Sequence, residues 1–331
     1  MARPQRFCLV GAGAHARTKL IPALEANGQE IVGVVSSQAK SALGGRTVYD
    51  SLETAMEKLA DDTAFLVATP PAAHFAQVKA IVRAGRDVSV EKPAFVTGRD
   101  AREIERLCAS VETVVAEGFM HRHTAAYERL AMFWASQRPR ITRLEMGFLI
   151  PEAPVGTFRR EREIASSSIF DIGCYPVSLL ADLGLDLGPL RVADVAFPGI
   201  VDQECVRVAG VLDGVEVTAQ IGVGPRYANF VSIDLRGGDG LRCEPFFYGR
   251  KGAKSITRLQ EGAAAVETLN DHDGFEAMFA MTRETWLADQ PRRLAQMIEV
   301  ADKLETLGQQ VSARRAAAQG SGGLGSDPRS H

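Results

Sequence analysis

The sequence has few of the features that stabilise small secreted proteins or anchor membrane proteins. Its 331 residues include only 5 cysteines, and none form a C-x-x-C pair or a Cys/His cluster with ligand spacing. We therefore expect no disulfide framework and no structural metal. No apolar run approaches the ~18 residues of a membrane span, and no signal-peptide-like stretch opens the chain. A net charge of -3 provides no general basic field for nucleic acid. The default expectation is a cytoplasmic enzyme or binding protein.

The first third of the chain alternates short β-branched runs with longer amphipathic stretches. This alternation is typical of a parallel sheet with helices on both faces. We expect strands at 7–10, 30–35, 47–49, 64–68, 87–90 and 113–116, and helices at 15–27, 51–59, 73–84 and 99–108. Six such strands indicate a doubly wound nucleotide-binding domain.

After Gly118 the sequence becomes richer in strands. A helix is expected at 124–137, strands at 141–150, 191–201, 206–212, 215–223, 229–235 and 241–247, and a helical stretch at 274–306. Turn signals such as Asp213-Gly214 favour antiparallel hairpins. We therefore predict an α/β protein with a doubly wound parallel sheet in 1–120, an α+β substrate-binding and oligomerisation domain with a mostly antiparallel open sheet in 121–312, and a flexible tail in 313–331, whose end has linker composition.

A glycine-rich motif follows the first expected strand. Residues 11–16, Gly-Ala-Gly-Ala-His-Ala, fit G-x-G-x-x-A directly between a strand and a helix. Such glycines allow a tight turn and close backbone approach, so that a pyrophosphate rests on the helix N-terminus. The plain alternative is an ordinary strand-to-helix turn, but the context on both sides favours dinucleotide binding by Gly11, Gly13, Ala14 and His15.

The second expected strand lacks the acidic residue that accepts the adenosine ribose hydroxyls in NAD-binding proteins. Val35 is followed instead by Ser36 and Ser37, with Lys40 nearby. Hydroxyls and an ammonium accept a 2′-phosphate that a carboxylate would repel. This segment favours NADP over NAD, and the alternative is a loop that binds NAD less selectively.

Two further elements stand at strand ends. Thr69, Pro70 and His74 follow one strand, and Glu91 and Lys92 follow the next. Because ligands bind outside the carboxyl ends of strands in open α/β sheets, we expect all five residues at the cofactor site. Lys92 would then project towards the nicotinamide. An isolated lysine is usually a solvated surface charge. The expected role of Lys92 therefore rests on its place at the carboxyl end of a strand.

Taken together, these elements resemble the glucose–fructose oxidoreductase / inositol dehydrogenase (Gfo/Idh/MocA) family of oxidoreductases. The matching segments, in order, are 11–16, T-P-x-x-x-H at 69–74, A-G-x-x-V-x-x-E-K-P at 84–93, E-G-F-M-H-R at 117–122, F-R at 158–159 and D-I-G-C-Y-P at 171–176. The resemblance implies an N-terminal Rossmann domain, an NADP or NAD cofactor, and a C-terminal sheet through which relatives form homodimers or homotetramers.

The resemblance also implies catalytic roles. Relatives place an Asp-x-Gly-x-His or Asp-x-Gly-x-Tyr element beside the lysine of Glu-Lys-Pro, which here means Asp171, Tyr175 and Lys92. Tyr175 would exchange the hydroxyl proton, with Lys92 polarising the substrate oxygen and favouring the phenolate. Asp171 and Tyr175, four residues apart, would share one helix face, with Gly173 leaving room for a ligand. The structural alternative is that Asp171 caps a helix and Tyr175 merely packs.

Three residues are weaker candidates for substrate binding. His121 and Arg122 lie at the expected domain junction, and Arg159 matches an arginine that relatives direct at cofactor or substrate. Arg159 could bind a carboxylate or phosphate bidentately, or belong to a solvated, salt-bridged face. His121 and His123 have no visible third ligand, so a metal is not expected.

The sequence therefore predicts an NAD(P)-dependent oxidoreductase acting on a secondary alcohol or ketone of a sugar, a nucleotide-sugar or a cyclic polyol. Two alternatives stay open. One is a redox-neutral NAD-dependent glycosidase that uses the same site, and the other is a non-catalytic dinucleotide sensor. Sensors on this fold tend to lose the lysine, and Lys92 is present.

Overall fold

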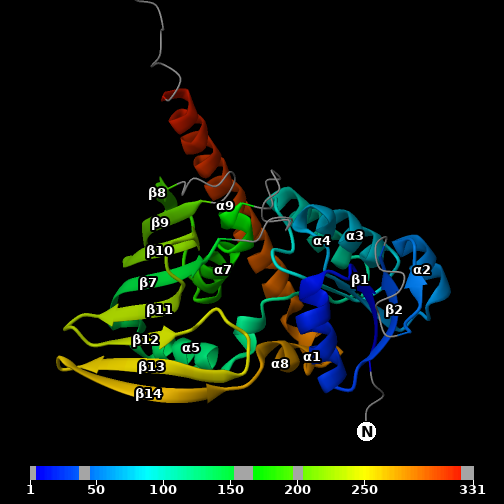
Figure 1. Cartoon of the computed structure of the whole chain (residues 1–331), viewed down its shortest axis with the longest axis horizontal. Helices are drawn as coiled ribbons and strands as arrows, with labels where there is room; N and C mark the ends of the chain where they lie inside the picture. Colours follow the sequence, from blue (N-terminus) through cyan, green and yellow to red (C-terminus); the bar gives the residue numbers. More distant parts are fainter. Residues whose placement is uncertain (1–4, 37–44, 153–166, 197–203, 322–331) are drawn as a thin grey trace, which may run out of the picture.

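Two sheets lie side by side and share one long C-terminal helix (Figure 1). The computed structural model describes residues 5–36, 45–152, 167–196 and 204–321. The α/β prediction is confirmed: a six-stranded parallel sheet precedes an eight-stranded, mostly antiparallel one.

The first sheet has the strand order β3-β2-β1-β4-β5-β6, and every pair in it is parallel. Its strands are β1 (Arg6–Val10), β2 (Glu30–Val35), β3 (Val48–Tyr49), β4 (Thr63–Val67), β5 (Val88–Val90) and β6 (Val115–Glu117). Every residue of β4 is buried, as expected for a parallel strand covered on both faces. The strand order reverses between β1 and β4, which is where dinucleotides bind in such sheets.

The helices of this half are η1 (Ala16–Leu20), α1 (Ile21–Ala26), α2 (Leu52–Lys58), α3 (Pro71–Arg83) and α4 (Gly98–Cys108). Ser51 and Thr97 cap α2 and α4 by accepting hydrogen bonds from backbone amides. One detail differs from the sequence prediction. The expected continuous helix over 15–27 opens with a π-helical turn at η1 before it becomes α-helical.

The second sheet has the order β14-β13-β12-β11-β7-β10-β9-β8, with only β7 and β10 parallel among its pairs. Its strands are β7 (Ile141–Ile150), β8 (Arg191–Ala196), β9 (Cys205–Leu212), β10 (Val215–Val223), β11 (Ala228–Leu235), β12 (Gly240–Glu244), β13 (Gly252–Gln260) and β14 (Ala263–Asp271). Burial alternates along β11, so one face packs on the core and the other is more open.

The remaining helices pack around and between the sheets. They are η2 (Met120–His123), α5 (Ala125–Gln137), η3 (Arg138–Arg140), α6 (Ser168–Asp171), α7 (Cys174–Asp182), α8 (Gly274–Phe279) and α9 (Arg283–Ser321). In Figure 1, α9 rises between the large sheet and α4, and it contacts α4, α6, α7 and β8. None of the described helices is long and apolar enough to cross a membrane.

One hairpin was missed from the sequence, and two sequence expectations need correction. The hairpin of β13 and β14 was not predicted, because β14 is exposed along almost its whole length and lacks apolar alternation. The strand expected over 241–247 ends at Glu244, since Pro245 has no amide to donate. Residues 313–321, expected in a flexible tail, continue α9. Residues 197–201, expected to end a strand, lie outside the described residues.

Candidate active site

The glycine motif forms a tight turn at the carboxyl end of β1. Gly11 has a φ of +93° and donates its amide to the Val35 carbonyl at 2.9 Å. A Cβ atom at Gly11 would lie 2.9 Å from the Ala68 carbonyl oxygen, so no larger residue fits here. At Gly13, by contrast, a Cβ atom would meet nothing within 4 Å. The space in front of the helix N-terminus is open, which fits a dinucleotide pyrophosphate.

His15 and Glu91 face each other beside this turn. The Nε2 atom of His15 lies 3.5 Å from Oε2 of Glu91, and the His15 ring contacts the edge of the Phe275 ring. The other Glu91 oxygen, Oε1, is buried and has no hydrogen-bond partner among the described residues. Oε2 is therefore the Glu91 oxygen that lies on the side of His15, whereas Oε1 is enclosed by the protein.

His74 connects the segments that follow β4 and β5. Its ring is fully buried, with Nδ1 3.0 Å from the Pro93 carbonyl and Nε2 2.8 Å from the Thr69 carbonyl. Burial lowers the pKa of His74, and a neutral ring donates to only one carbonyl at a time. His74 therefore holds the segment around Lys92 in place from inside the protein, and no surface of its ring is left for direct cofactor contact.

Thr69, Pro70 and Ser36 lie where the sequence places them, at strand ends. The Thr69 methyl group is next to Gly11, and its hydroxyl donates to Gln77 at 2.7 Å. Pro70 precedes the first residue of α3. Ser36 follows β2 and donates its amide to the Tyr49 carbonyl. Ser37 lies outside the described residues, so the expectation of NADP stays a prediction.

The structure brings Lys92, Asp171 and Tyr175 together. Lys92 lies just beyond β5, and its ammonium donates to the Asp171 carbonyl at 2.7 Å and to Asp171 Oδ1 at 3.0 Å. The same nitrogen lies 5.0 Å from the centre of the Tyr175 ring. The Lys92 and Asp171 side chains are only 13% and 5% exposed, so this ion pair is shielded from solvent screening.

Tyr175 is enclosed by other aromatic rings. It contacts Phe119, His121, Phe148 and Phe247, and its hydroxyl donates to the Met120 sulfur at 3.7 Å. Burial raises the pKa of the Tyr175 phenol above its usual value, and the Lys92 charge opposes this rise without cancelling it. The phenol is therefore protonated at neutral pH.

The local backbone differs from the single helix expected for Asp171 and Tyr175. Asp171 ends α6 and Tyr175 is the second residue of α7, whose N-cap is Gly173. The alternative of Asp171 as an N-cap is therefore wrong. A Cβ atom at Gly173 would lie 2.5 Å from the Ile169 carbonyl oxygen, so this glycine lets the two short helices pack closely and leaves no space for a ligand.

The candidate substrate residues His121 and Arg122 are inside the protein. His121 is fully buried among five aromatic rings. The Arg122 guanidinium is 6% exposed and pairs with Asp182 at 2.7 Å, while Arg293 pairs with the other Asp182 oxygen at 2.9 Å. Both residues thus lie inside the protein, and Arg122 is held there by its ion pair with Asp182. Arg159 lies outside the described residues.

One positioning residue was missed by sequence reasoning. Glu117, the last residue of β6, is buried and accepts a hydrogen bond from the Ala94 amide at 2.8 Å. Ala94 follows Lys92 by two residues, so Glu117 supports the loop that carries the lysine. The only signal was its place in the E-G-F-M-H-R segment, which had been used for the resemblance and not for a role.

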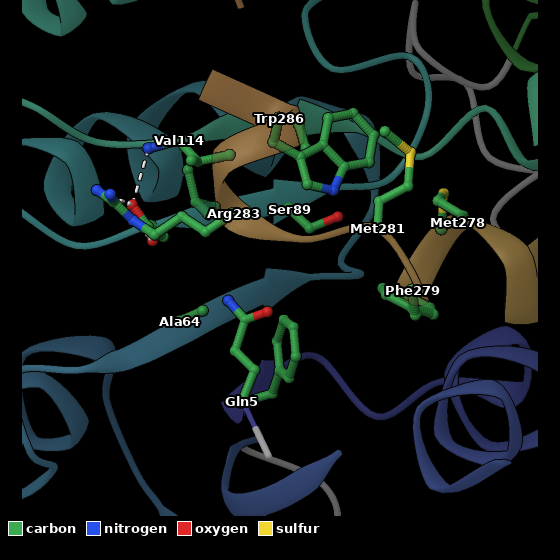
Figure 2. A pocket seen from close by; sticks show the side chains of 13 residues that line it. Gln5, Ala64, Ser89, Val114, Met278, Phe279, Met281, Arg283 and Trp286 are labelled. Atoms are coloured by element: carbon green, nitrogen blue, oxygen red, sulfur yellow. Dashed lines mark hydrogen bonds and ion pairs between the residues drawn. The ribbon is translucent and has the colours of Figure 1, made fainter. Parts of the chain in front are cut away.

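A small cavity of about 40 Å³ lies at the opposite, amino-terminal end of the parallel strands (Figure 2). Ala64 and Ser89 line it from the sheet, Gln5 from just before β1, and Trp286 from α9. None of the predicted site residues lines this cavity. Its volume suits a few water molecules rather than a dinucleotide. Among the residues with described positions, no group of three His, Cys, Asp or Glu side chains is arranged to hold a metal.

The doubly wound sheet and the glycine turn define a dinucleotide-binding α/β protein with two sheets. Residues 5–119 match the model of the oxidoreductase family with an NAD-binding Rossmann fold, GFO_IDH_MocA. This match agrees with the resemblance that the sequence motifs carry, and it covers the N-terminal part of the chain, which is a Rossmann domain of the Gfo/Idh/MocA type. Members of this family are NAD(P)-dependent dehydrogenases and reductases.

Curated relatives are distant and act on sugars. The chain is 25% identical over 305 residues to D-xylose 1-dehydrogenase (NADP(+)) 2 of Haloferax volcanii, covering 86% of this chain and 90% of the relative. It is 28% identical over 255 residues to dTDP-3,4-didehydro-2,6-dideoxy-alpha-D-glucose 3-reductase of Actinomadura kijaniata, covering 72% and 74%.

Solved structures share the fold at low identity. A 3-ketoreductase from Actinomadura kijaniata, in complex with NADP and TDP-benzene, has a TM-score of 0.77 and 19% identity, covering 93% of this chain and 98% of that one. The aldose-aldose oxidoreductase from Caulobacter crescentus, complexed with glycerol, has a TM-score of 0.72 and 16% identity, covering 96% and 98%. At these identities the likeness concerns the two-sheet architecture alone.

Proposed function

We propose that this protein transfers a hydride between a nicotinamide cofactor and a secondary alcohol or ketone of a sugar, a nucleotide-sugar or a cyclic polyol. One observation carries the proposal. The Lys92 ammonium, held by Asp171, lies 5.0 Å from the centre of the Tyr175 ring, just beyond the carboxyl end of β5. In an open α/β sheet this edge is where ligands bind.

Each of the three residues has a distinct chemical task in this proposal. When bound, the cofactor supplies or accepts the hydride at its nicotinamide ring. Lys92 binds the substrate oxygen and stabilises the negative charge that develops on it. Asp171 holds the Lys92 ammonium in place through its carbonyl and its carboxylate. Tyr175 moves the proton to or from that oxygen.

The burial of Tyr175 favours the reductive direction. Because burial raises the pKa of its phenol, the group carries its proton at neutral pH. A protonated phenol is ready to donate to a carbonyl oxygen, whereas it must first lose its proton to act as a base. We therefore propose ketone reduction as the more favourable direction at neutral pH.

We also propose NADP as the preferred cofactor. The residues after β2 are Ser36 and Ser37, followed by Lys40, with no carboxylate to repel a 2′-phosphate. The Haloferax relative is named as an NADP(+) enzyme, and the Actinomadura 3-ketoreductase was solved in complex with NADP. We further propose that the protein forms a homodimer or homotetramer through the C-terminal sheet. We also propose a cytoplasmic location.

The test is a substrate screen. Purified protein with NADPH or NADH is mixed with ketosugars, nucleotide-linked ketosugars and cyclic ketones, and absorbance at the reduced-nicotinamide wavelength is followed. The proposal is supported if wild type oxidises the reduced cofactor in the presence of one of these compounds and both Lys92→Ala and Tyr175→Phe lose this activity. Bound cofactor with no net change favours the redox-neutral glycosidase, and no reaction with any compound favours the sensor.

A further inference from the structure

The helix that ends in Asp171 receives its N-terminal cap from a distant residue. α6 has only four residues, and its N-cap residue, Ser167, makes no capping hydrogen bond with its side chain. The amides of a first helical turn need an acceptor from elsewhere. Glu204 provides it, since its Oε1 accepts from the Ser168 amide at 2.9 Å while its backbone carbonyl accepts from the Ser168 hydroxyl at 2.9 Å.

Glu204 is in turn held by the C-terminal helix. Its side chain is fully buried, and Oε2 accepts from Nη2 of Arg315 at 3.0 Å. A buried carboxylate persists only when it is paired and hydrogen-bonded. Arg315, in the last turns of α9, supplies that charge from the segment whose sequence resembles a tail.

Two glycines fix the position of α6 between β10 and α9. A Cβ atom at Gly222, in β10, would lie 2.0 Å from the Glu204 carbonyl oxygen and 2.9 Å from the Ser168 hydroxyl. At Gly308, in α9, it would lie 2.9 Å from the Phe170 ring. Glu204 and Ser168 fill the space beside Gly222, and Phe170 fills the space beside Gly308, so α6 has little freedom to shift while Glu204 is in place.

We propose that the Arg315–Glu204 pair positions Asp171 and, through it, the Lys92 ammonium. Ser168 and Asp171 are the first and last residues of the same four-residue helix. Since Asp171 holds Lys92 with both its carbonyl and its carboxylate, a shift of α6 displaces both acceptors together. Glu204 and Arg315 touch neither substrate nor cofactor in this arrangement; they are positioning residues. The inference rests on the proposed function, in which Lys92 binds the substrate oxygen.

The test compares two adjacent arginines in the full chain. Arg315→Ala removes the guanidinium that pairs with Glu204 Oε2. Arg314→Ala is the matched control, because Arg314 donates to the Ala193 and Val192 carbonyls of β8 and not to Glu204. We expect Arg315→Ala to lower kcat by about tenfold or more, as small misplacements of catalytic groups do. KM for the cofactor and the activity of Arg314→Ala should stay unchanged, and Arg315→Lys should recover most of the loss.

A second measurement does not depend on activity. An amine-acylating reagent is added, and mass spectrometry of the peptide that contains Lys92 gives the labelling rate of this lysine. If α6 shifts away, Lys92 loses an ion-pair partner and is labelled severalfold faster in Arg315→Ala than in wild type or Arg314→Ala. If Arg315→Ala does not fold, the double variant with Glu204→Gln, which leaves no unpaired buried charge, is measured in the same way.

Two results would overturn the inference. One is a folded Arg315→Ala protein with wild-type kcat and wild-type labelling of Lys92. The other is an equal loss in both arginine variants, because that would mean general loosening of α9. If wild type reduces no sugar at all while labelling still rises only in Arg315→Ala, the positioning role stands and the proposed function fails.

Discussion

The ammonium of Lys92 is bound twice by one residue, through the backbone carbonyl of Asp171 at 2.7 Å and its carboxylate at 3.0 Å. These contacts join the loop after β5 of the first sheet to the short helix α6 that packs on the second. The residue proposed to bind the substrate oxygen is therefore oriented from the other half of the molecule. Any change in the packing of the two halves would act directly on this nitrogen.

Removing one member of this buried pair should cost more stability than removing both. Lys92→Met leaves the Asp171 carboxylate, 5% exposed, without its cation. We expect the free energy of unfolding to fall by about 3–5 kcal/mol, and the double variant Lys92→Met with Asp171→Asn to recover much of it, because an uncompensated buried charge causes most of the loss. Urea unfolding measures both. Neither variant should turn over substrate, and equal stability of the two would contradict the ion pair.

Tyr175→Phe should abolish most of the activity and preserve the fold. Within the part of the chain that the structure describes, the hydroxyl donates to the Met120 sulfur, a weak contact whose loss we expect to cost less than about 1 kcal/mol. If the phenol moves the proton, kcat should fall roughly 10²–10⁴-fold while the affinity for cofactor is unchanged. Stopped-flow assays and cofactor titration separate the two effects, and wild-type turnover by this variant would remove Tyr175 from the mechanism.

The pH profile of wild type tests the protonation state of the same phenol. Because burial raises the pKa of Tyr175 above its usual value of 10.0, the proton donor remains protonated through that pH. The rate of ketone reduction should therefore show no loss attributable to Tyr175 between about pH 8 and 10. Oxidation of the alcohol should rise with pH over the same interval. A reductive rate that falls with an apparent pKa near 7 would favour a phenolate-forming site instead.

The sequence predicted the fold well because hydrophobic patterning is a local property. The strands over 30–35, 141–150 and 215–223 have the expected bounds, since each alternates or concentrates apolar residues between clear turn signals. The hairpin of β13 and β14 was not predicted for the converse reason. Its exposed strand β14 begins with Ala263, Ala264 and Ala265 and has neither the alternation of a half-buried strand nor a continuous apolar run.

The site was predictable only in part, because side-chain partners are set by distant contacts. The grouping of Lys92 with Asp171 came from family resemblance and not from spacing, since 79 residues separate them. Arg122 was expected near substrate, but its partner Asp182 lies 60 residues away and holds it inside the protein. Glu204 carried no motif at all. Nothing local in a sequence shows that a glutamate caps a helix 36 residues before it.

Cofactor preference should depend on the residue after β2. Ser36→Asp introduces a carboxylate that would repel a 2′-phosphate and accept ribose hydroxyls instead. We expect the affinity for NADPH to fall about tenfold or more, the effect of losing one hydrogen bond to a charged group. Affinity for NADH should stay equal or improve. Fluorescence titration with both nucleotides measures this, with Ser36→Ala as control for loss of the hydroxyl alone. Parallel losses for both nucleotides would place the 2′-phosphate elsewhere.

His121 is a source of acid sensitivity in the core. Both ring nitrogens are buried without a hydrogen-bond partner in the part of the chain that the structure describes. Burial lowers the pKa of His121 well below its usual 6.5, and that of His123 to about 4. Since the unfolded chain takes up these protons first, the stability present above pH ~6.5 is lost as pH falls from there towards 4.

His121→Phe should therefore stabilise the protein most at low pH. The aromatic pocket formed by Phe119, Tyr175 and Phe247 suits a phenyl ring, which has no polar atoms to desolvate. Between pH 7.5 and 5.0, we expect the variant to lose about 1–2 kcal/mol less unfolding free energy than wild type. Urea denaturation at both pH values measures this. His15→Asn is the control for removing a histidine at an exposed position, because the His15 side chain is 49% exposed. If His121→Phe retains the full acid sensitivity, His121 is hydrogen-bonded in solution and its nitrogens have a partner.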